Sequence, residues 1–239
     1  MLLSEIFDYL NYGELAPLAI GNETEGGIPT ESFPKVVSHL NLGLLALYTE
    51  FPLRHNSVVV QMRSDVTKYI LKPQYSVNNI SEPITYILDT VTEPFVGRVL
   101  KINKVVSSDE EECLLLNDSN DSNTTENTVR TIAHNVLQVS NPDPSHTLTV
   151  YYREGPEKID PVGLDPTTTE IELSETLIEP LLYYIAARAH ARTPALEGQQ
   201  SISSLYMQKY DRALSILKEN GVIENHPIIN DSLTRNGWV

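Results

Sequence analysis

Apolar residues near the start of the chain recur at helical spacing and predict two helices. Four fall on one face of residues 2–10, and seven fall on one face of residues 36–51. The two sets are Leu3, Ile6, Phe7 and Leu10, then Val36, Val37, Leu40, Leu44, Leu47, Tyr48 and Phe51. Residues 21–31, with three glycines and a proline, predict a loop. Pro52 ends the second helix, because proline cannot continue the hydrogen-bond ladder.

The middle of the chain changes to short runs rich in β-branched and aromatic residues, separated by Asn, Asp, Pro and Ser. The runs are SVVVQM, TKYIL, PFVGRVLKINKVV, ECLLLND, TVRTIAHNVLQV and HTLTVYYRE. Several short strands with frequent turn signals predict an antiparallel β-sandwich or barrel-like domain. Between the first two runs, Arg63-Ser64-Asp65 predicts a hairpin turn.

Helical spacing returns after Ser174, which is a good N-cap residue. Because Pro180 follows so closely, we expect a turn or kink over residues 174–179 and then a regular helix to about Arg192. Its apolar face is Leu181, Leu182, Ile185, Ala186 and Ala189. A last helix has apolar positions at Ile202, Leu205, Tyr206, Ala213, Leu214 and Leu217. Gly221 is placed to end that helix in the left-handed conformation.

These periods predict an α+β fold with helices from both chain ends and strands between them. We expect residues 1–55 and 173–222 to form one helical bundle, interrupted by an antiparallel β domain over residues 56–172. Residues 223–239 show no period and predict an extended C-terminal tail.

Charge and cysteine content narrow the functional classes. The formal net charge is −15, with a pI near 4.7. Such a surface repels phosphate within a screening length of about 8–10 Å. This charge argues against a protein that binds specific DNA or RNA sequences. The single cysteine, Cys113, permits no intrachain disulfide. The first ten residues lack the basic region of a signal peptide, and no segment approaches the ~20 apolar residues of a membrane span.

Sequence motifs for metals, cofactors and nucleophiles are missing. The six histidines include no pair at the helical spacing of a zinc site. The acidic run at 108–113 lacks the alternating ligands and the glycine of a calcium loop. Phosphate-binding, dinucleotide and nucleophile-elbow motifs do not occur. Acidic neighbours raise the pKa of a thiol, so Cys113 is not expected to be reactive. The sequence therefore predicts no catalytic, cofactor or metal site.

The helix after Ser174 allows two interpretations. Its polar residues suit acid–base chemistry: Glu179, Tyr183, Tyr184, Arg188, His190 and Arg192. Its alanines at 186, 187, 189 and 191 instead let a second helix approach closely, and we favour this packing role.

The two C-terminal helices resemble those of bacteriophage head-to-tail adaptor proteins of short-tailed phages, the tail tubular protein A-like group. The first helix matches the family pattern at Leu182, Tyr184, Ala187, Arg188 and Ala189, and the second at Tyr206, Tyr210, Ala213 and Leu214. The segment LNLGLLALYTEFPLR and the β runs are similar in the same order, so the resemblance spans residues 30–222.

This resemblance implies a structural virion protein rather than an enzyme. It would form a homo-oligomeric ring, a dodecamer, between the portal protein and the tail nozzle or tail tube. Assembled in the host cytoplasm and located in the virion neck, the ring would be part of the DNA ejection channel, through which DNA passes without specific binding. Residues expected to pack the bundle or the ring are Leu182, Ile185, Ala186, Arg188, Ala189, Tyr206 and Tyr210.

Apolar residues persist in the C-terminal tail and suggest that it docks on a partner. The expected portal-docking residues are Ile228, Ile229, Leu233 and Trp238, the only tryptophan. Alternatively, Ile228 and Ile229 pack on the helices of their own chain. Two other functions stay open: another ring-forming neck or tail protein, such as a completion factor or tail terminator, and a small enzyme.

Overall fold

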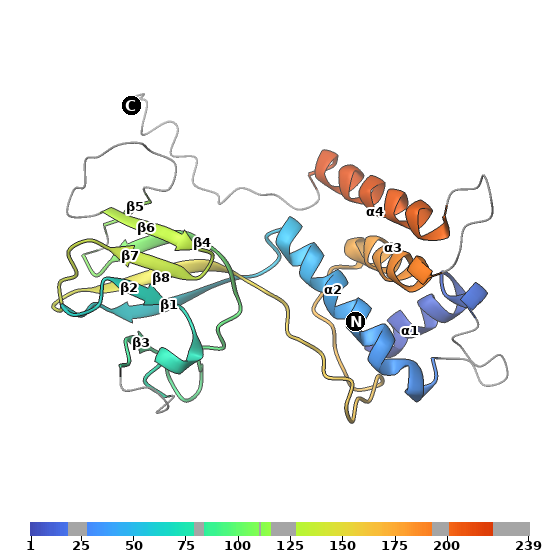
Figure 1. Ribbon diagram of the computed structural model, residues 1–239, viewed down its shortest axis with the longest axis horizontal. Helices are drawn as coiled ribbons and strands as arrows, with labels where there is room; N and C mark the ends of the chain where they lie inside the picture. Colours follow the sequence, from blue (N-terminus) through green and yellow to red (C-terminus); the bar gives the residue numbers. More distant parts are fainter. Residues whose placement is uncertain (19–27, 79–83, 110, 116–127, 193–200, 222–239) are drawn as a thin grey trace. The chain divides into compact units, whose positions relative to one another are not determined.

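The structure is a computed structural model of the 239-residue chain, in which residues 1–18, 28–78, 84–109, 111–115, 128–192 and 201–221 are described. The chain divides into two compact units. One contains Met1–Phe51 and Lys158–Val239, and the other is Pro52–Glu157. The described residues form four α-helices and two mainly antiparallel sheets, so the expected α+β class is confirmed (Figure 1).

The first unit contains all four α-helices: α1 (Leu3–Tyr12), α2 (Phe33–Glu50), α3 (Ile178–Ala189) and α4 (Ile202–Glu219). Short 3₁₀ turns lie at Ala16–Leu18, Thr30–Ser32, Glu175–Leu177 and His190–Arg192. The apolar faces predicted for the first two helices are buried at every position, which confirms the periodicity. Helix α3 contacts each of the other three helices and is the centre of this unit.

Residues 158–172 pack on the helices, although the sequence analysis assigned them to the β domain. The Asn41 amide of α2 donates a hydrogen bond to the Ile159 carbonyl at 2.9 Å and accepts one from the Ile159 N–H at 3.0 Å. Near the other end of the segment, the Tyr48 hydroxyl donates to the Glu172 carbonyl at 2.9 Å. The second unit ends at Glu157, 15 residues before the boundary expected at residue 172.

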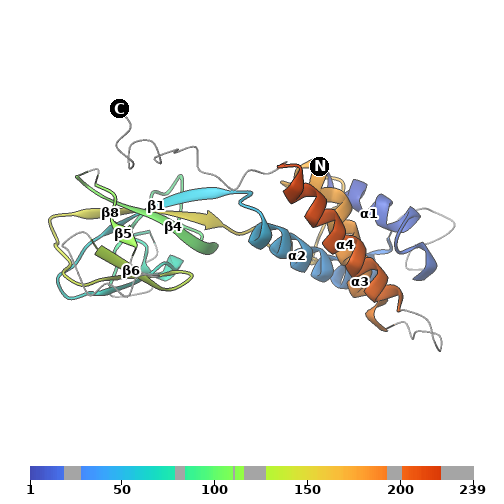
Figure 2. The ribbon, with the colours of Figure 1, turned by 90° about the horizontal axis from the view of Figure 1, so that it is seen from above.

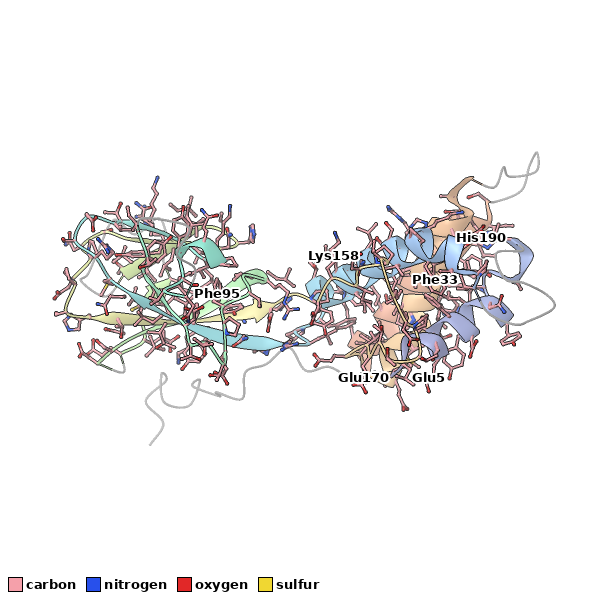
Figure 3. All side chains as sticks on the ribbon, turned by 90° about the horizontal axis from the view of Figure 1, so that it is seen from below. Glu5, Phe33, Phe95, Lys158, Glu170 and His190 are labelled. Atoms are coloured by element: carbon pink, nitrogen blue, oxygen red, sulfur yellow. The ribbon has the colours of Figure 1, made fainter. Side chains whose placement is uncertain are left out.

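The same segment holds the N-terminus of the chain. Leu2 forms an antiparallel bridge with Glu170, and the N–H of Leu3 donates to the Thr169 carbonyl at 2.9 Å. The Leu2 N–H also donates to a Glu5 carboxylate oxygen at 2.8 Å, and Figure 3 shows Glu5 and Glu170 at the same end of the helical unit. Residues more than 160 positions apart are thus joined by backbone hydrogen bonds.

The second unit contains eight strands in two sheets among the described residues. The strands are β1 (His55–Gln61), β2 (Lys68–Ile70), β3 (Ile87–Leu88), β4 (Val99–Ser107), β5 (Leu114–Leu115), β6 (Thr128–Ala133), β7 (Val136–Val139) and β8 (Thr147–Glu154). The sheet orders are β3-β1-β8-β4 and β2-β7-β6-β5, and only the short β5–β6 pair is parallel. Neither sheet closes on itself in the described part of the chain, so the barrel-like alternative is wrong.

The predicted hairpin at Arg63-Ser64-Asp65 is wrong, although a turn does occur there. The Val66 N–H donates to the Arg63 carbonyl at 3.1 Å, but β1 and β2 belong to different sheets. The Tyr69 hydroxyl accepts from the Arg63 N–H at 3.0 Å and donates to the Arg63 carbonyl at 3.3 Å, which fixes this corner. The connection therefore carries the chain from one sheet to the other.

Both sheets contribute to one hydrophobic core in the second unit. It includes Val58, Val60, Ile102, Val105, Leu148 and Val150 from the first sheet and Tyr69, Val129, Leu137 and Val139 from the second. Phe95, labelled in Figure 3, also belongs to it and lies edge-on to Tyr152 at 6.1 Å between ring centroids.

Candidate functional site

Helix α3 begins as the sequence analysis expected, with a turn before the regular helix. Ser174 precedes the 3₁₀ turn Glu175–Leu177, and α3 follows directly. Pro180 is the third residue of α3, where its missing N–H costs nothing because the first four N–H groups of a helix have no intrahelical partner. Regular α-helix ends at Ala189, and a 3₁₀ turn extends the structure to Arg192.

The buried face of α3 lies inside its own unit. Leu182, Ile185 and Ala186 are all buried, and Tyr210 of α4 is also buried. These four residues of the predicted packing set therefore pack within their own chain. The three members that keep accessible surface are Arg188, which is exposed, and Ala189 and Tyr206, which are half-buried.

The described polar residues of α3 do not all meet at one point. The Tyr183 hydroxyl donates to a Glu179 carboxylate oxygen at 2.6 Å. Tyr184 lies edge-on to Tyr210 of α4, with 5.3 Å between ring centroids. Arg188 is close enough to help lower the pKa of His39 of α2, although burial of His39 is the larger cause. The side chain of Arg192 lies outside the described part of the structure.

An aromatic cluster joins the end of α3 to α4. The ring of His190 stacks on Tyr206 at 5.5 Å between centroids, and Lys209 Nζ lies 5.1 Å from the Tyr206 centroid and 5.4 Å from that of Tyr183. His190 is 1% exposed, and its Nε2 lies 3.0 Å from the Glu14 carbonyl. Cation–π contacts of this kind contribute about 0.5–1 kcal/mol at exposed sites.

The protonation behaviour of this cluster suits packing better than proton transfer. The hydrogen bond to Glu179, together with burial, raises the pKa of Tyr183 to about 12. Burial, with a smaller effect of Glu14, also raises the pKa of Tyr206. Both hydroxyls stay protonated near neutral pH, and His190 is enclosed, so none of the three presents a base to solvent. The interpretation of α3 as a packing helix stays a prediction.

Two grooves border α4, the red helix in Figure 2. The first, which we call the α2–α4 groove, has a volume of about 620 Å³. Its apolar lining is Leu42, Leu45, Ala46, Tyr184, Tyr210 and Leu214. The second, the α3–α4 groove, has a volume of about 390 Å³ and is lined by Glu179, Pro180, Tyr183, Lys209, Arg212 and Ile216, among others. The described residues that line the two grooves include no histidine or cysteine.

Much of the apolar surface predicted for α4 is not buried within the chain. Ile202 is 41% exposed and Leu205 is 45% exposed. Ile216, which was not in the predicted set, is also exposed. Only Tyr210 and Leu214 of this 18-residue helix are buried. Ser203 anchors the helix start, since its hydroxyl donates to the Ala187 carbonyl at 2.7 Å. Ile202 and Leu205 lie about one turn apart near the start of α4, whereas Ile216 lies three turns further along the helix, with Lys209 and Arg212 between them.

The second unit contains a buried carboxylate that the sequence analysis missed. Glu154 is 1% exposed. Its carboxylate forms ion pairs with Arg54 at 2.9 Å and with Arg98 at 3.0 Å, and it accepts a hydrogen bond from the Asn56 amide at 3.2 Å. Its partners come from positions about 50 to 100 residues earlier, so no local motif marks them. Because both oxygens are occupied, this group stabilises the fold and is not available as a base.

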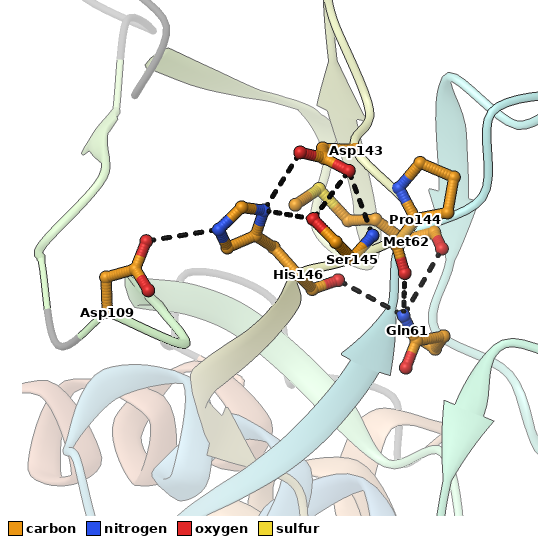
Figure 4. Close-up of polar contacts among 7 residues, drawn as sticks. All are labelled: Gln61, Met62, Asp109, Asp143, Pro144, Ser145 and His146. Atoms are coloured by element: carbon orange, nitrogen blue, oxygen red, sulfur yellow. Dashed lines mark hydrogen bonds and ion pairs between the residues drawn. The ribbon is translucent and has the colours of Figure 1, made fainter.

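Asp143, Ser145 and His146 form a turn whose composition resembles a catalytic triad but whose geometry does not (Figure 4). Asp143 and Ser145 both contact His146 Nδ1, at 3.1 and 3.0 Å, and the Ser145 hydroxyl donates to Asp143 at 2.8 Å. His146 Nε2 lies 3.2 Å from an Asp109 oxygen. A triad needs the serine on the opposite ring nitrogen from the aspartate. This cluster therefore ties the turn to residue 109.

The described residues include no group of three or more His, Cys, Asp or Glu side chains that could hold a metal ion. In the acidic run, Glu112 forms an ion pair with Lys104 at 3.0 Å, and Asp109 contacts His146. Burial, and then Glu111 and Glu112, raise the pKa of the Cys113 thiol, as expected. None of the described helices has the length and apolar content needed to span a bilayer.

The four proposed portal-docking residues lie outside the described residues. The sequence matches no known protein-family model, and a search of curated proteins finds no significant match.

Proposed function

We propose that this protein is a structural adaptor that assembles into a ring, a dodecamer, between the portal and the tail of a short-tailed phage. The observation that supports this best is the exposure of three apolar residues on α4, namely Ile202, Leu205 and Ile216. Only Tyr210 and Leu214 of this helix are buried. Such a surface suits a subunit that completes its packing against neighbours. The ordered resemblance over residues 30–222 supplies the identity of those neighbours.

The proposal includes a finer view of the fold. The four helices would act as one bundle centred on α3, and the two sheets as a sandwich around their common core. The ring would use the accessible residues Arg188, Ala189 and Tyr206, together with the exposed apolar residues of α4. The tail, residues 223–239, would reach the portal through Ile228, Ile229, Leu233 and Trp238.

The charge of the chain agrees with a role beside moving DNA. With −15 per subunit, a ring of twelve copies repels phosphate wherever its acids line the bore. The protein would be located in the virion neck after assembly in the host cytoplasm. DNA would then pass through it without specific binding.

Mixing the purified chain with portal rings tests the proposal. We expect the two to co-sediment, with twelve chains per portal ring by mass photometry, while the isolated chain remains monomeric. The matched variants are Trp238→Ala, which should weaken portal binding at least about tenfold, and Trp238→Phe, which should weaken it less.

The other functions give different results in the same assay. A tail terminator would bind tail tubes and leave portal rings bare. An enzyme would bind neither assembly. Failure to bind portal under conditions where the portal remains a ring would overturn the adaptor proposal.

A further inference from the structure

Part of the α2–α4 groove is an apolar surface that the described chain leaves uncovered. Polar residues also line the groove, namely Thr49, Glu50, Asp211, Ser215 and Lys218. Leu42 is 38% exposed and Leu45 is 43% exposed, although both are on a helix whose opposite face is fully buried. Tyr184 and Tyr210 line the groove between the helices. A groove of about 620 Å³ is large enough to hold several side chains of an extended segment.

One end of this groove is marked by an ion pair between Glu50 and Lys218. These residues lie at the C-terminal ends of α2 and α4, so both helices finish at the same end of the groove. Just beyond, Gly221 has φ of +61° and its N–H donates to the Lys218 carbonyl at 3.2 Å. A left-handed residue at this position turns a chain away from the helix axis. Gly221, the last described residue of the chain, therefore follows Lys218, which lines the groove, by three positions.

The segment that starts there has apolar residues at a suitable distance. The groove extends along α4 from Lys218 back to Tyr210, about 12 Å at 1.5 Å per residue. An extended chain covers about 3.3 Å per residue, so roughly four residues span that length. Ile228 and Ile229 follow Gly221 by seven and eight positions, which leaves enough chain for the reversal.

We propose that residues 222–229 of the same chain occupy the α2–α4 groove, with Ile228 and Ile229 against Leu42 and Leu45. The occupant is the chain's own segment because its attachment point lies at the groove end. Tethering through a short linker gives an effective concentration in the millimolar range, well above that of a second copy in a dilute solution. The groove is thus the binding site for an apolar peptide already attached to it.

This inference concerns the isolated chain and does not depend on the adaptor proposal. If both hold, portal and groove compete for the same two isoleucines. Portal binding would then withdraw the segment and expose Leu42 and Leu45.

Disulfide trapping in the isolated full-length chain tests the inference. In a Cys113→Ala background, Ile228→Cys is combined with Leu45→Cys in one protein and with Ile216→Cys in the matched control. Leu45 and Ile216 are almost equally exposed, at 43% and 45%, but Ile216 lies in the α3–α4 groove and is closer to residue 228 in sequence. A segment without a preferred site would favour the control pair.

We expect the Leu45→Cys pair to form an intramolecular bridge at least about tenfold faster than the Ile216→Cys pair under dilute oxidising conditions. Oxidation of a mixture of isotope-labelled and unlabelled chains separates intramolecular from intermolecular bridges by mass. Equal rates for the two pairs, or a faster control, would overturn the proposal. Bridges of mixed isotope composition would assign the groove to a second copy instead.

A second measurement covers the case in which the cysteine variants fail to fold. A peptide of residues 222–239 is added to the chain truncated after residue 221, and binding is followed by the emission of its single tryptophan. Saturable binding that Leu45→Asp abolishes and Ile216→Asp retains supports the proposal. Binding that both substitutions leave unchanged contradicts it.

Discussion

Replacing Tyr86 with phenylalanine removes one hydroxyl that makes two hydrogen bonds to a single residue of the other sheet. The Ile70 N–H donates to this hydroxyl at 2.8 Å, and the hydroxyl donates to the Ile70 carbonyl at 3.0 Å. Ile70 ends β2, which lies at the edge of its sheet. Ile70 pairs with Val136 of β7 on one side, and the hydroxyl takes the place of a strand partner on the free side.

The cost follows from these two bonds. A typical intramolecular hydrogen bond contributes about 0.5–1.5 kcal/mol net, so their loss should lower the free energy of unfolding by about 1–3 kcal/mol. Packing should change little, because the remaining ring keeps its stacking on Tyr75 at 5.0 Å and its edge contact with Tyr69 at 5.1 Å. For a unit of this size, each kcal/mol corresponds to about 4–8 °C in Tm.

Urea unfolding followed by circular dichroism measures the loss, and hydrogen exchange of a peptide spanning residues 66–75 locates it. The Ile70 amide should exchange faster in the variant. Tyr75→Phe is the matched control, because the Tyr75 hydroxyl makes no hydrogen bond to the described residues. Equal stability of the two variants, with unchanged exchange at Ile70, would refute this account of the β2 edge.

Three further changes test the helical unit. Gly43→Ala should destabilise it by about 1–3 kcal/mol in a thermal melt, because the new Cβ would lie 2.7 Å from Leu181 Cδ1; an unchanged Tm would contradict this packing. Ser203→Ala should cost about 0.5–1.5 kcal/mol and speed amide exchange in α4, since it removes the bond to α3; identical exchange would argue against that anchor. Stability should fall between about pH 10 and pH 12, because the folded state raises the pKa of Tyr183 and Tyr210 to about 12 and so binds their protons more tightly than the unfolded chain. The urea midpoint measures this slope, which Tyr183→Phe should make shallower.

Local periodicity was enough to predict the helices but not how the strands associate. The faces of α1 and α2 were correct at each position because burial on one side imposes a 3.6-residue repeat. The turn at residues 63–65 was also visible, but the separation of β1 and β2 into two sheets depends on partners far along the chain. Residues 158–172 have no period at all, since they pack through backbone and amide hydrogen bonds.

The candidate site shows a different limit of sequence reasoning. Ile202 and Leu205 have the same helical spacing whether they are buried or exposed. The sequence analysis therefore could not predict that both are exposed. Glu154 was missed because Arg54 and Arg98 are distant in sequence and carry no motif. Conversely, Asp143, Ser145 and His146 are adjacent, but their geometry gives a structural turn.

The division of the helical unit between the two chain ends has a consequence for synthesis on the ribosome. Helix α2 ends at Glu50, whereas its partner α3 begins at Ile178, about 130 residues later. At roughly 5–20 residues per second, α2 leaves the exit tunnel about 6–25 s before the residues that cover its apolar face. During that interval the β unit can fold, but the face of α2 stays open to other nascent chains and to chaperones. We therefore compare two sets of equally destabilising substitutions, one on the buried face of α2 and one in the β unit. The expression yield of the α2 variants should depend more strongly on chaperone supply.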